Sequence, residues 1–155
     1  MKTKQQLTET DFEYIQLSLI HLGIAKWTKS AIRLKRAIEY VLSHDTIPEV
    51  TVGCMYRTLA EQEGYTYEVM EHSLRYAINN LWSCDPRNCS KLFFRSAEPL
   101  QCPSVSHFLY LYTAAFQRGV IKEYVDSLQE QNEVLDEQDR KGVQDLLDNM
   151  AKIEI

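Results

Sequence analysis

The chain has 155 residues, of which 45% are hydrophobic and 25% charged, and its formal net charge is −5. These values are typical of one globular domain, or of one domain with an appendage, and they argue against a disordered chain. No apolar run approaches the ~20 residues of a membrane span, and the N-terminus lacks the hydrophobic core of a signal peptide. We therefore expect a cytoplasmic protein that does not enter a membrane.

The charge is unevenly distributed along the sequence. Residues 21–118 carry 11 basic and 9 acidic residues, which gives +2, whereas the residues from Gly119 onward carry 4 basic and 10 acidic residues, which gives −6. The acidity therefore lies mainly in the C-terminal stretch, and the middle of the chain is mildly basic. A nucleic-acid binder needs local basic surface more than a high overall pI, and an excess of +2 is small.

The first half of the chain predicts two helices. Thr8 or Thr10 is suited to cap a helix that runs through His21 and ends at Gly23. Thr28 is suited to cap a second helix through about Ser43. The spacing of its apolar residues predicts a buried side made of Ile32, Leu34, Ala37, Ile38, Val41 and Leu42. Its exposed side is expected to carry Lys29, Arg33, Lys35 and Arg36.

After a loop predicted over 44–51, the stretch Val52–Trp82 reads as a helix, a tight turn and a longer helix. Gly64 suits the left-handed conformation that closes the first helix, and Thr66 suits the N-cap of the second. The predicted buried stripe of the second helix is Val69, Met70, Ser73, Leu74, Ala77, Ile78 and Leu81. Its outward face is predicted to hold Tyr67, Glu68, Glu71, His72 and Arg75. A helix of this kind, with a partner helix behind it, fits the DNA major groove, although an ordinary helical hairpin has the same pattern.

The remaining elements are also helical by pattern. Asp85–Pro86 is expected to break the long helix, and a short helix near Asn88–Arg95 follows. Ser104 or Ser106 then begins an aromatic-rich helix whose expected role is in the core. The acidic stretch from Val120 suggests two amphipathic helices with a break near Asn132–Asp136, forming either a solvated face or a regulatory or dimer element.

The sequence offers no sign of enzymatic chemistry, because it has no phosphate-binding glycine loop, no nucleophile elbow and no metalloprotease motif. We expect no enzyme activity and no cofactor. The cysteines Cys84, Cys89 and Cys102, with His107 downstream, match no common zinc module, so reduced thiols are the favoured interpretation.

Three blocks in order resemble the C-terminal DNA-binding domain of the stage-zero sporulation protein A response regulators of spore-forming Firmicutes. The blocks are Ile20–Ile24 with Ala31–Glu39, then Tyr56–Trp82, and finally Pro103–Phe108. The resemblance implies an all-α, winged-helix-like bundle that contains a helix-turn-helix over residues 8–118. The amphipathic pattern, not the resemblance, predicts the additional helices over 119–155. It also implies a transcription regulator whose second motif helix, about residues 66–82, enters the major groove of double-stranded DNA.

The resemblance and the helical pattern together predict the residues of a DNA-binding site. The expected base- or backbone-contacting residues are Thr66, Tyr67, Glu68, Val69, Glu71, His72 and Arg75, and the expected phosphate contacts are Arg33, Lys35 and Arg36. Val69 and His72 stand where the family motif has arginines, and Glu61–Gln62 replaces a basic pair. The alternative is therefore a helical bundle that has lost DNA binding and binds a protein, with the C-terminal helices available for a homodimer or another partner.

Overall fold

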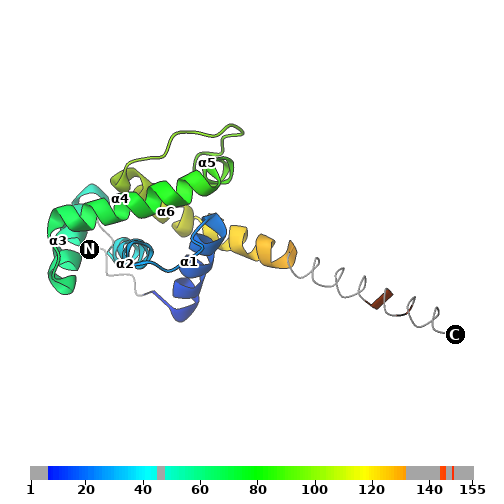
Figure 1. Ribbon diagram of the computed structural model, residues 1–155, viewed down its shortest axis with the longest axis horizontal. Helices are drawn as coiled ribbons and strands as arrows, with labels where there is room; N and C mark the ends of the chain where they lie inside the picture. Colours follow the sequence, from blue (N-terminus) through cyan, green and yellow to red (C-terminus); the bar gives the residue numbers. More distant parts are fainter. Residues whose placement is uncertain (1–6, 45–47, 132–143, 146–147, 149–155) are drawn as a thin grey trace.

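The computed structural model describes residues 7–44, 48–131, 144–145 and 148, and helices are the only regular elements in these ranges. The bounded helices are α1 (Glu9–Leu22), α2 (Lys29–Ser43), α3 (Pro48–Glu63), α4 (Tyr67–Cys84), α5 (Pro86–Phe94) and α6 (Val105–Gln117). Residues 120–131 form a further helical stretch (Figure 1). The all-α class is confirmed, while a wing of the winged-helix kind is missing from these ranges because they contain no strand.

Side-chain caps start four of the helices where the sequence indicated. Thr8, Thr28, Thr66 and Ser104 each accept a hydrogen bond from the backbone N–H three residues later. At α1, Asp11 completes a capping box, because its carboxylate accepts from the Thr8 backbone N–H at 3.0 Å. Such caps satisfy amide groups that the first turn leaves without partners.

Gly23 ends α1 with backbone geometry that only glycine adopts without strain. Its φ is +140°, its N–H donates to the carbonyl of Ile20, and the next N–H, of Ile24, donates to the carbonyl of Leu19 at 3.0 Å. This is the hydrogen-bond pattern of a Schellman motif. A Cβ at Gly23 would lie 2.7 Å from the Cβ of Cys84, so α1 and the end of α4 meet closely at this point.

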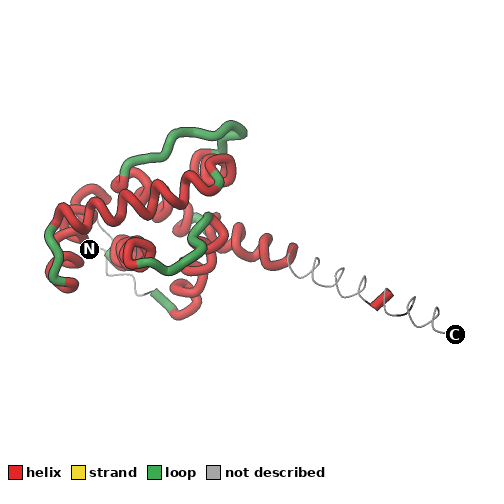
Figure 2. The backbone as a smooth tube through the Cα atoms, viewed as in Figure 1, coloured by secondary structure: helices red, strands yellow, loops and turns green. Residues whose placement is uncertain are grey.

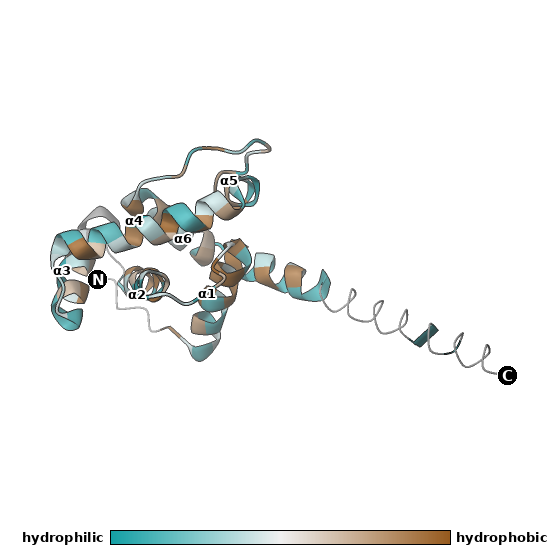
Figure 3. Cartoon of the chain, in the orientation of Figure 1, coloured by the Kyte–Doolittle hydropathy of each residue, from teal (hydrophilic) through white to brown (hydrophobic). Residues whose placement is uncertain are grey.

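The centre of the molecule is the packing of α2 against α4, which is the most extensive helix–helix contact. α4 runs across the molecule with α3 at one end and α5 at the other, and α6 also packs against α2, α3 and α4 (Figures 1 and 2). Apolar and polar residues alternate along the helices (Figure 3), as expected for amphipathic elements around one core. The largest fully buried side chains include Tyr112, Phe108, Leu34, Met70 and Leu74.

Two predicted helix starts and one predicted buried position in this part of the fold differ from the structure. α3 begins at Pro48, inside the predicted loop, because proline is favoured at the first helical position. α5 begins at Pro86 rather than near Asn88, since Asp85 caps it by accepting from the Asn88 N–H. Ile32, predicted to be buried, is 38% exposed.

The start of the predicted C-terminal extension packs onto the body. Ile121 and Val125 are fully buried, Lys122 pairs with Asp11 at 3.0 Å, and the hydroxyl of Tyr14 donates to Asp126 at 2.7 Å. The predicted break at 132–136 and the predicted apolar positions Val143, Leu146, Leu147 and Met150 lie outside the described residues.

The link between Asp11 and Lys122 predicts a pH dependence of stability. Burial raises the pKa of Asp11, but hydrogen bonds from the Thr8 backbone and from Lys122 outweigh it and leave the pKa below its ordinary value. A carboxyl with a lowered folded-state pKa contributes stability above its unfolded pKa, and this contribution is lost as the pH falls through the folded-state value.

We therefore expect Asp11→Asn to lower the melting temperature at pH 7 and to narrow the difference between the melting temperatures at pH 7 and pH 3. Glu9→Gln, a charge removal in the same helical turn, serves as the control and should leave the difference as it is in the wild-type chain. Equal pH profiles for Asp11→Asn and the wild type would contradict the assignment. Thermal unfolding followed by circular dichroism measures both values.

In the ranges that the structure describes, no helix combines the length and the apolar character needed to cross a lipid bilayer.

Candidate nucleic-acid interface

The pair α3–α4 is joined by a turn of only three residues. Gly64 has a φ of +74°, and the N–H of Tyr65 donates to the carbonyl of Ala60 at 2.9 Å, which closes α3. Thr66 then starts α4, and its hydroxyl accepts from the N–H of Val69 at 3.2 Å. The turn residues anticipated from the sequence are therefore those that connect the two helices.

One side of α4 is buried and the other is exposed, largely as predicted. The buried residues are Met70, Ser73, Leu74, Ala77, Ile78, Leu81 and Trp82. Tyr67, Glu68, His72 and Arg75 are exposed. Val69, predicted to lie in the buried stripe, is 43% exposed, so it belongs to the outward surface as well. The first turns of α4 thus present a continuous face to solvent.

Two residues of this face form an ion pair with each other. Arg75 donates a hydrogen bond to the carboxylate of Glu71, one helical turn earlier, and the Glu71 side chain is 33% exposed. A pair at this spacing is worth only a few tenths of a kcal/mol, about 0.2–0.5, on a helix surface. The Arg75 guanidinium is therefore kept extended over the face but is readily released to another acceptor.

Tyr56 on α3 packs against Tyr67 at the start of the same face of α4. Its ring lies 4.7 Å from the ring of Tyr67, centroid to centroid. Burial, with a smaller effect of the neighbouring Tyr67, raises the pKa of Tyr56 to about 12. Tyr56 is therefore a neutral packing residue at physiological pH, and it holds Tyr67 against α3.

Arg33 does not lie where the sequence placed it. The expectation of an exposed phosphate-binding side chain is wrong, because Arg33 is only 8% exposed. Its Nε donates to Glu63 at 3.1 Å, one terminal nitrogen donates to the hydroxyl of Ser73 at 2.9 Å, and its guanidinium lies 4.0 Å from the ring centre of Tyr65. Arg33 therefore joins α2 to α3, to the turn and to α4, and its role is to position these elements.

The other two predicted phosphate contacts are more accessible, but both are paired. Arg36 is 55% exposed in its side chain and lies 2.5 Å from the second oxygen of Glu63. Lys35 pairs with Glu39 at 3.1 Å within α2. Two lysines outside the predicted site, Lys26 and Lys29, are exposed at the start of α2 and form no ion pair with another described residue. The helical pattern predicts Lys29 on the exposed side of this helix, whereas Lys26 lies in the loop before α2, where periodicity gives no signal.

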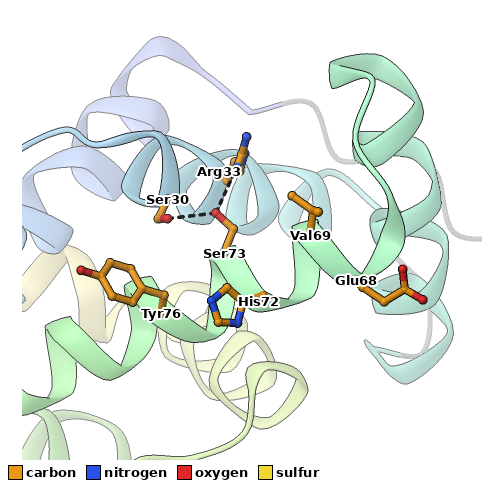
Figure 4. A pocket seen from close by; sticks show the side chains of 7 residues that line it. All are labelled: Ser30, Arg33, Glu68, Val69, His72, Ser73 and Tyr76. Atoms are coloured by element: carbon orange, nitrogen blue, oxygen red, sulfur yellow. Dashed lines mark hydrogen bonds between the residues drawn. The ribbon is translucent and has the colours of Figure 1, made fainter.

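A groove of about 500 Å³ runs between α2 and α4. Its lining residues are Ser30, Arg33, Glu68, Val69, His72, Ser73 and Tyr76. Figure 4 shows the Ser73 hydroxyl hydrogen-bonded to both the Ser30 hydroxyl and the Arg33 guanidinium. His72 and Tyr76 lie beside Ser73 on α4. Tyr76, 55% exposed, and Ser30 were absent from the sequence-based site, because neither carries the charge or motif position used to choose it.

The side chains exposed at this surface can form hydrogen bonds. Across the described residues, no three or more His, Cys, Asp and Glu side chains come together as metal ligands would. The thiol of Cys89 is buried, and burial raises its pKa to about 12, so it is a poor metal ligand and a poor nucleophile. The exposed face of α4 instead offers phenol, imidazole, carboxylate and guanidinium groups, all of which can contact base edges or phosphates.

No protein-family model, curated protein sequence or solved structure matches the chain.

Proposed function

We propose that this protein binds double-stranded DNA as a transcription regulator, with α3 and α4 acting as a helix-turn-helix and α4 entering the major groove. The observation that carries the proposal is the outward face of α4. Its first turns expose Tyr67, Glu68, His72 and Arg75, while the opposite side is fixed by α2. A recognition helix needs both properties, because only an exposed face reaches the bases and only a fixed helix reads them in register.

Several residues of this face have a chemical partner in the groove. Arg75 suits a guanine, since a guanidinium donates two hydrogen bonds to guanine O6 and N7. Glu71, released from Arg75, suits the amino group of cytosine, and Val69 suits the methyl group of thymine. Thr66 and Tyr67, at the start of α4, suit the sugar–phosphate backbone, to which helix N-termini commonly bind.

Contacts to the phosphates of the DNA backbone come from basic side chains that flank this face of α4. Lys26 and Lys29 at the start of α2 are unpaired among the described residues, and Arg36 needs only to leave a mostly exposed ion pair. Each phosphate neutralised lowers the logarithm of the binding constant by about 0.9 per tenfold increase in salt. Three such contacts give an expected slope of about −3.

The test is a selection of duplexes from a random pool by the full-length chain, followed by fluorescence anisotropy on the enriched duplex. The full length is needed because Ile121 and Val125, which lie beyond the predicted domain end at residue 118, belong to the packed body. We expect an enriched sequence and an affinity that falls with salt. A pool that stays random, with no duplex bound at low salt, would rule the proposal out.

The sharpest single change is Arg75→Ala. The loss of a bidentate base contact is expected to weaken specific binding by about 1–3 kcal/mol, roughly tenfold or more, and to relax the preference at one base pair. Arg118→Ala, an arginine removal at the end of α6, is the matched control and should bind as the wild type does. Equal losses from both variants would point to charge alone rather than to base reading.

A protein partner is the second candidate function, and it is favoured by the apolar side chains on the same surface. Tyr67, Val69 and Tyr76 are 54%, 43% and 55% exposed on α4, and aromatic residues are enriched at protein interfaces. The selection separates the two functions. If no duplex is enriched but Tyr76→Ala weakens a protein complex, the surface is a protein-binding one.

A further inference from the structure

The groove between α2 and α4 continues along α4 into a second hollow of about 280 Å³, and the two hollows share Ser30 and Tyr76. Four buried apolar residues line the second hollow, namely Ile24, Ala31, Ala77 and Leu81. The first hollow is lined instead by hydroxyl, imidazole and guanidinium groups. A cleft of about 300–1,000 Å³ with apolar walls and a few polar groups is the usual form of a small-molecule site.

A chain of hydrogen bonds crosses the first hollow and ends at Ser30 (Figure 4). A terminal nitrogen of Arg33 lies 2.9 Å from the Ser73 hydroxyl oxygen, which itself lies 2.9 Å from the Ser30 hydroxyl oxygen. A guanidinium can only donate, so Ser73 accepts from Arg33. Because Ser73 is only 5% exposed, its own proton finds little water and is satisfied by donating to Ser30. The chain of donors therefore runs from Arg33 through Ser73 to Ser30.

The hydroxyl proton of Ser30 is left for a ligand. Ser30 is only partly buried, and among the residues that the structure describes its hydroxyl bonds to Ser73 alone. Hydrogen bonds in a chain polarise one another, so a hydroxyl at the end of a chain that starts at a cation is a stronger donor. An ionised oxygen is the acceptor that such a donor binds best.

The charges around Ser30 favour an anion with a single charge. Lys26 lines the second hollow together with Ser30, is exposed and forms no ion pair with another described residue. The charge of Arg33 is already balanced by Glu63. Glu68 lines the first hollow, but Figure 4 shows its carboxylate turned away from the serine pair. Lys26 thus matches a carboxylate better than a phosphate monoester, which carries nearly two charges at pH 7.

We propose that this groove binds a small organic monocarboxylate that carries an aromatic or aliphatic group. The carboxylate accepts from the Ser30 hydroxyl beside Lys26, and the apolar group lies against Tyr76 and in the second hollow. The Tyr76 side chain is 55% exposed, and covering its ring with a ligand is favourable. The site shares Lys26 and Tyr76 with the surface proposed for DNA, but carboxylate binding needs no DNA and is measured without it.

The test is a titration of the ¹⁵N-labelled full-length chain with 3-phenylpropionate, followed by amide chemical shifts. A probe of this size is expected to bind with a Kd of about 1 mM, with saturable shifts centred on Ser30, Tyr76 and Ala77. The uncharged 3-phenylpropanol keeps the apolar group and should bind about tenfold more weakly.

Four outcomes of this titration would overturn the proposal. The first is the absence of saturable shifts, and the second is an equal affinity for the acid and the alcohol. The third is a set of shifts centred on Arg87 and Lys91 of α5, which would show that the probe follows exposed positive charge and not the groove. The fourth is tighter binding of 2-phenylethyl phosphate than of 3-phenylpropionate, because a dianion would then be the better ligand.

Two pairs of variants test the carboxylate contacts. Ser30→Ala removes the donor and should raise the Kd about tenfold, whereas Ser106→Ala, at the same second position of α6, should leave it unchanged. Lys26→Gln should raise the Kd about threefold and leave 3-phenylpropanol binding as it is, and Lys29→Gln, a charge removal outside both linings, is its control. Equal affinities within the serine pair would overturn the proposal. If Ser30→Ala fails to fold, equal affinities within the lysine pair would overturn it instead.

Discussion

Replacing Glu63 with alanine is expected to lower the free energy of unfolding by about 3 kcal/mol, because it leaves the buried guanidinium of Arg33 without its charge partner. The side chains of Arg33 and Glu63 are only 10% and 15% exposed, so water replaces the lost carboxylate poorly. The second ion pair of Glu63, with the largely exposed Arg36, adds little to the free energy of unfolding. For a chain of this size, the loss corresponds to a fall in melting temperature of about 10 °C.

Glu61→Ala is the matched control, since Glu61 is an exposed glutamate of the same helix. Its effect should stay within about 0.5 kcal/mol, as for most surface substitutions. Urea unfolding followed by circular dichroism gives both free energies. Equal stabilities for the two variants would show that the ion pair does not hold α2, α3 and the turn together.

Gly23→Ala is expected to destabilise the protein by about 3 kcal/mol, through backbone strain at positive φ and through a steric clash. The new methyl group would lie 2.7 Å from Cys84 Cβ and 3.2 Å from the carbonyl oxygen of Leu81, so α1 and α4 would have to move apart. The expected loss of unfolding free energy is larger than for the same substitution at a helix-capping glycine with open space around it.

Gly53→Ala tests the same substitution at a position that has neither a positive φ nor a neighbouring atom for the new methyl group to clash with. Gly53 lies within α3, and a Cβ built there meets no atom within 4 Å. Alanine is the better helix former by about 0.5–1 kcal/mol, so this variant should be more stable than the wild type. Opposite signs for the two variants are the expected outcome of parallel urea titrations, and a loss at both positions would contradict the geometry of Gly23.

The helix ends were readable from the sequence because their causes are local. Thr28 and Thr66 cap helices through bonds to residues three positions away, and Gly23 and Gly64 close helices through their own backbone freedom. The start of α3 does not follow from the sequence in the same way, because a proline suits a loop and a first helical turn equally well, and Pro48 occupies the latter.

The candidate site was harder to predict, because side-chain partners come from distant parts of the chain. The exposed positions of α4, such as His72 and Arg75, follow from helical periodicity. The burial of Arg33 does not, since its partner Glu63 is 30 residues away and its acceptor Ser73 is 40 residues away. A charged residue next to other basic residues normally indicates a solvated face, and only the folded arrangement shows that this one lies inside.

Asp85 is both the C-cap of α4 and the N-cap of α5, so it alone separates the two helices. Pro86 follows with its φ restricted by the ring, and Trp82 on α4 stacks on Phe93 of α5 at 6.2 Å between ring centres. The corner between the helices is therefore a rigid elbow without a hinge. A rotation imposed on α4 is therefore passed on to α5, and the indole of Trp82 keeps its contact with Phe93 while both helices move.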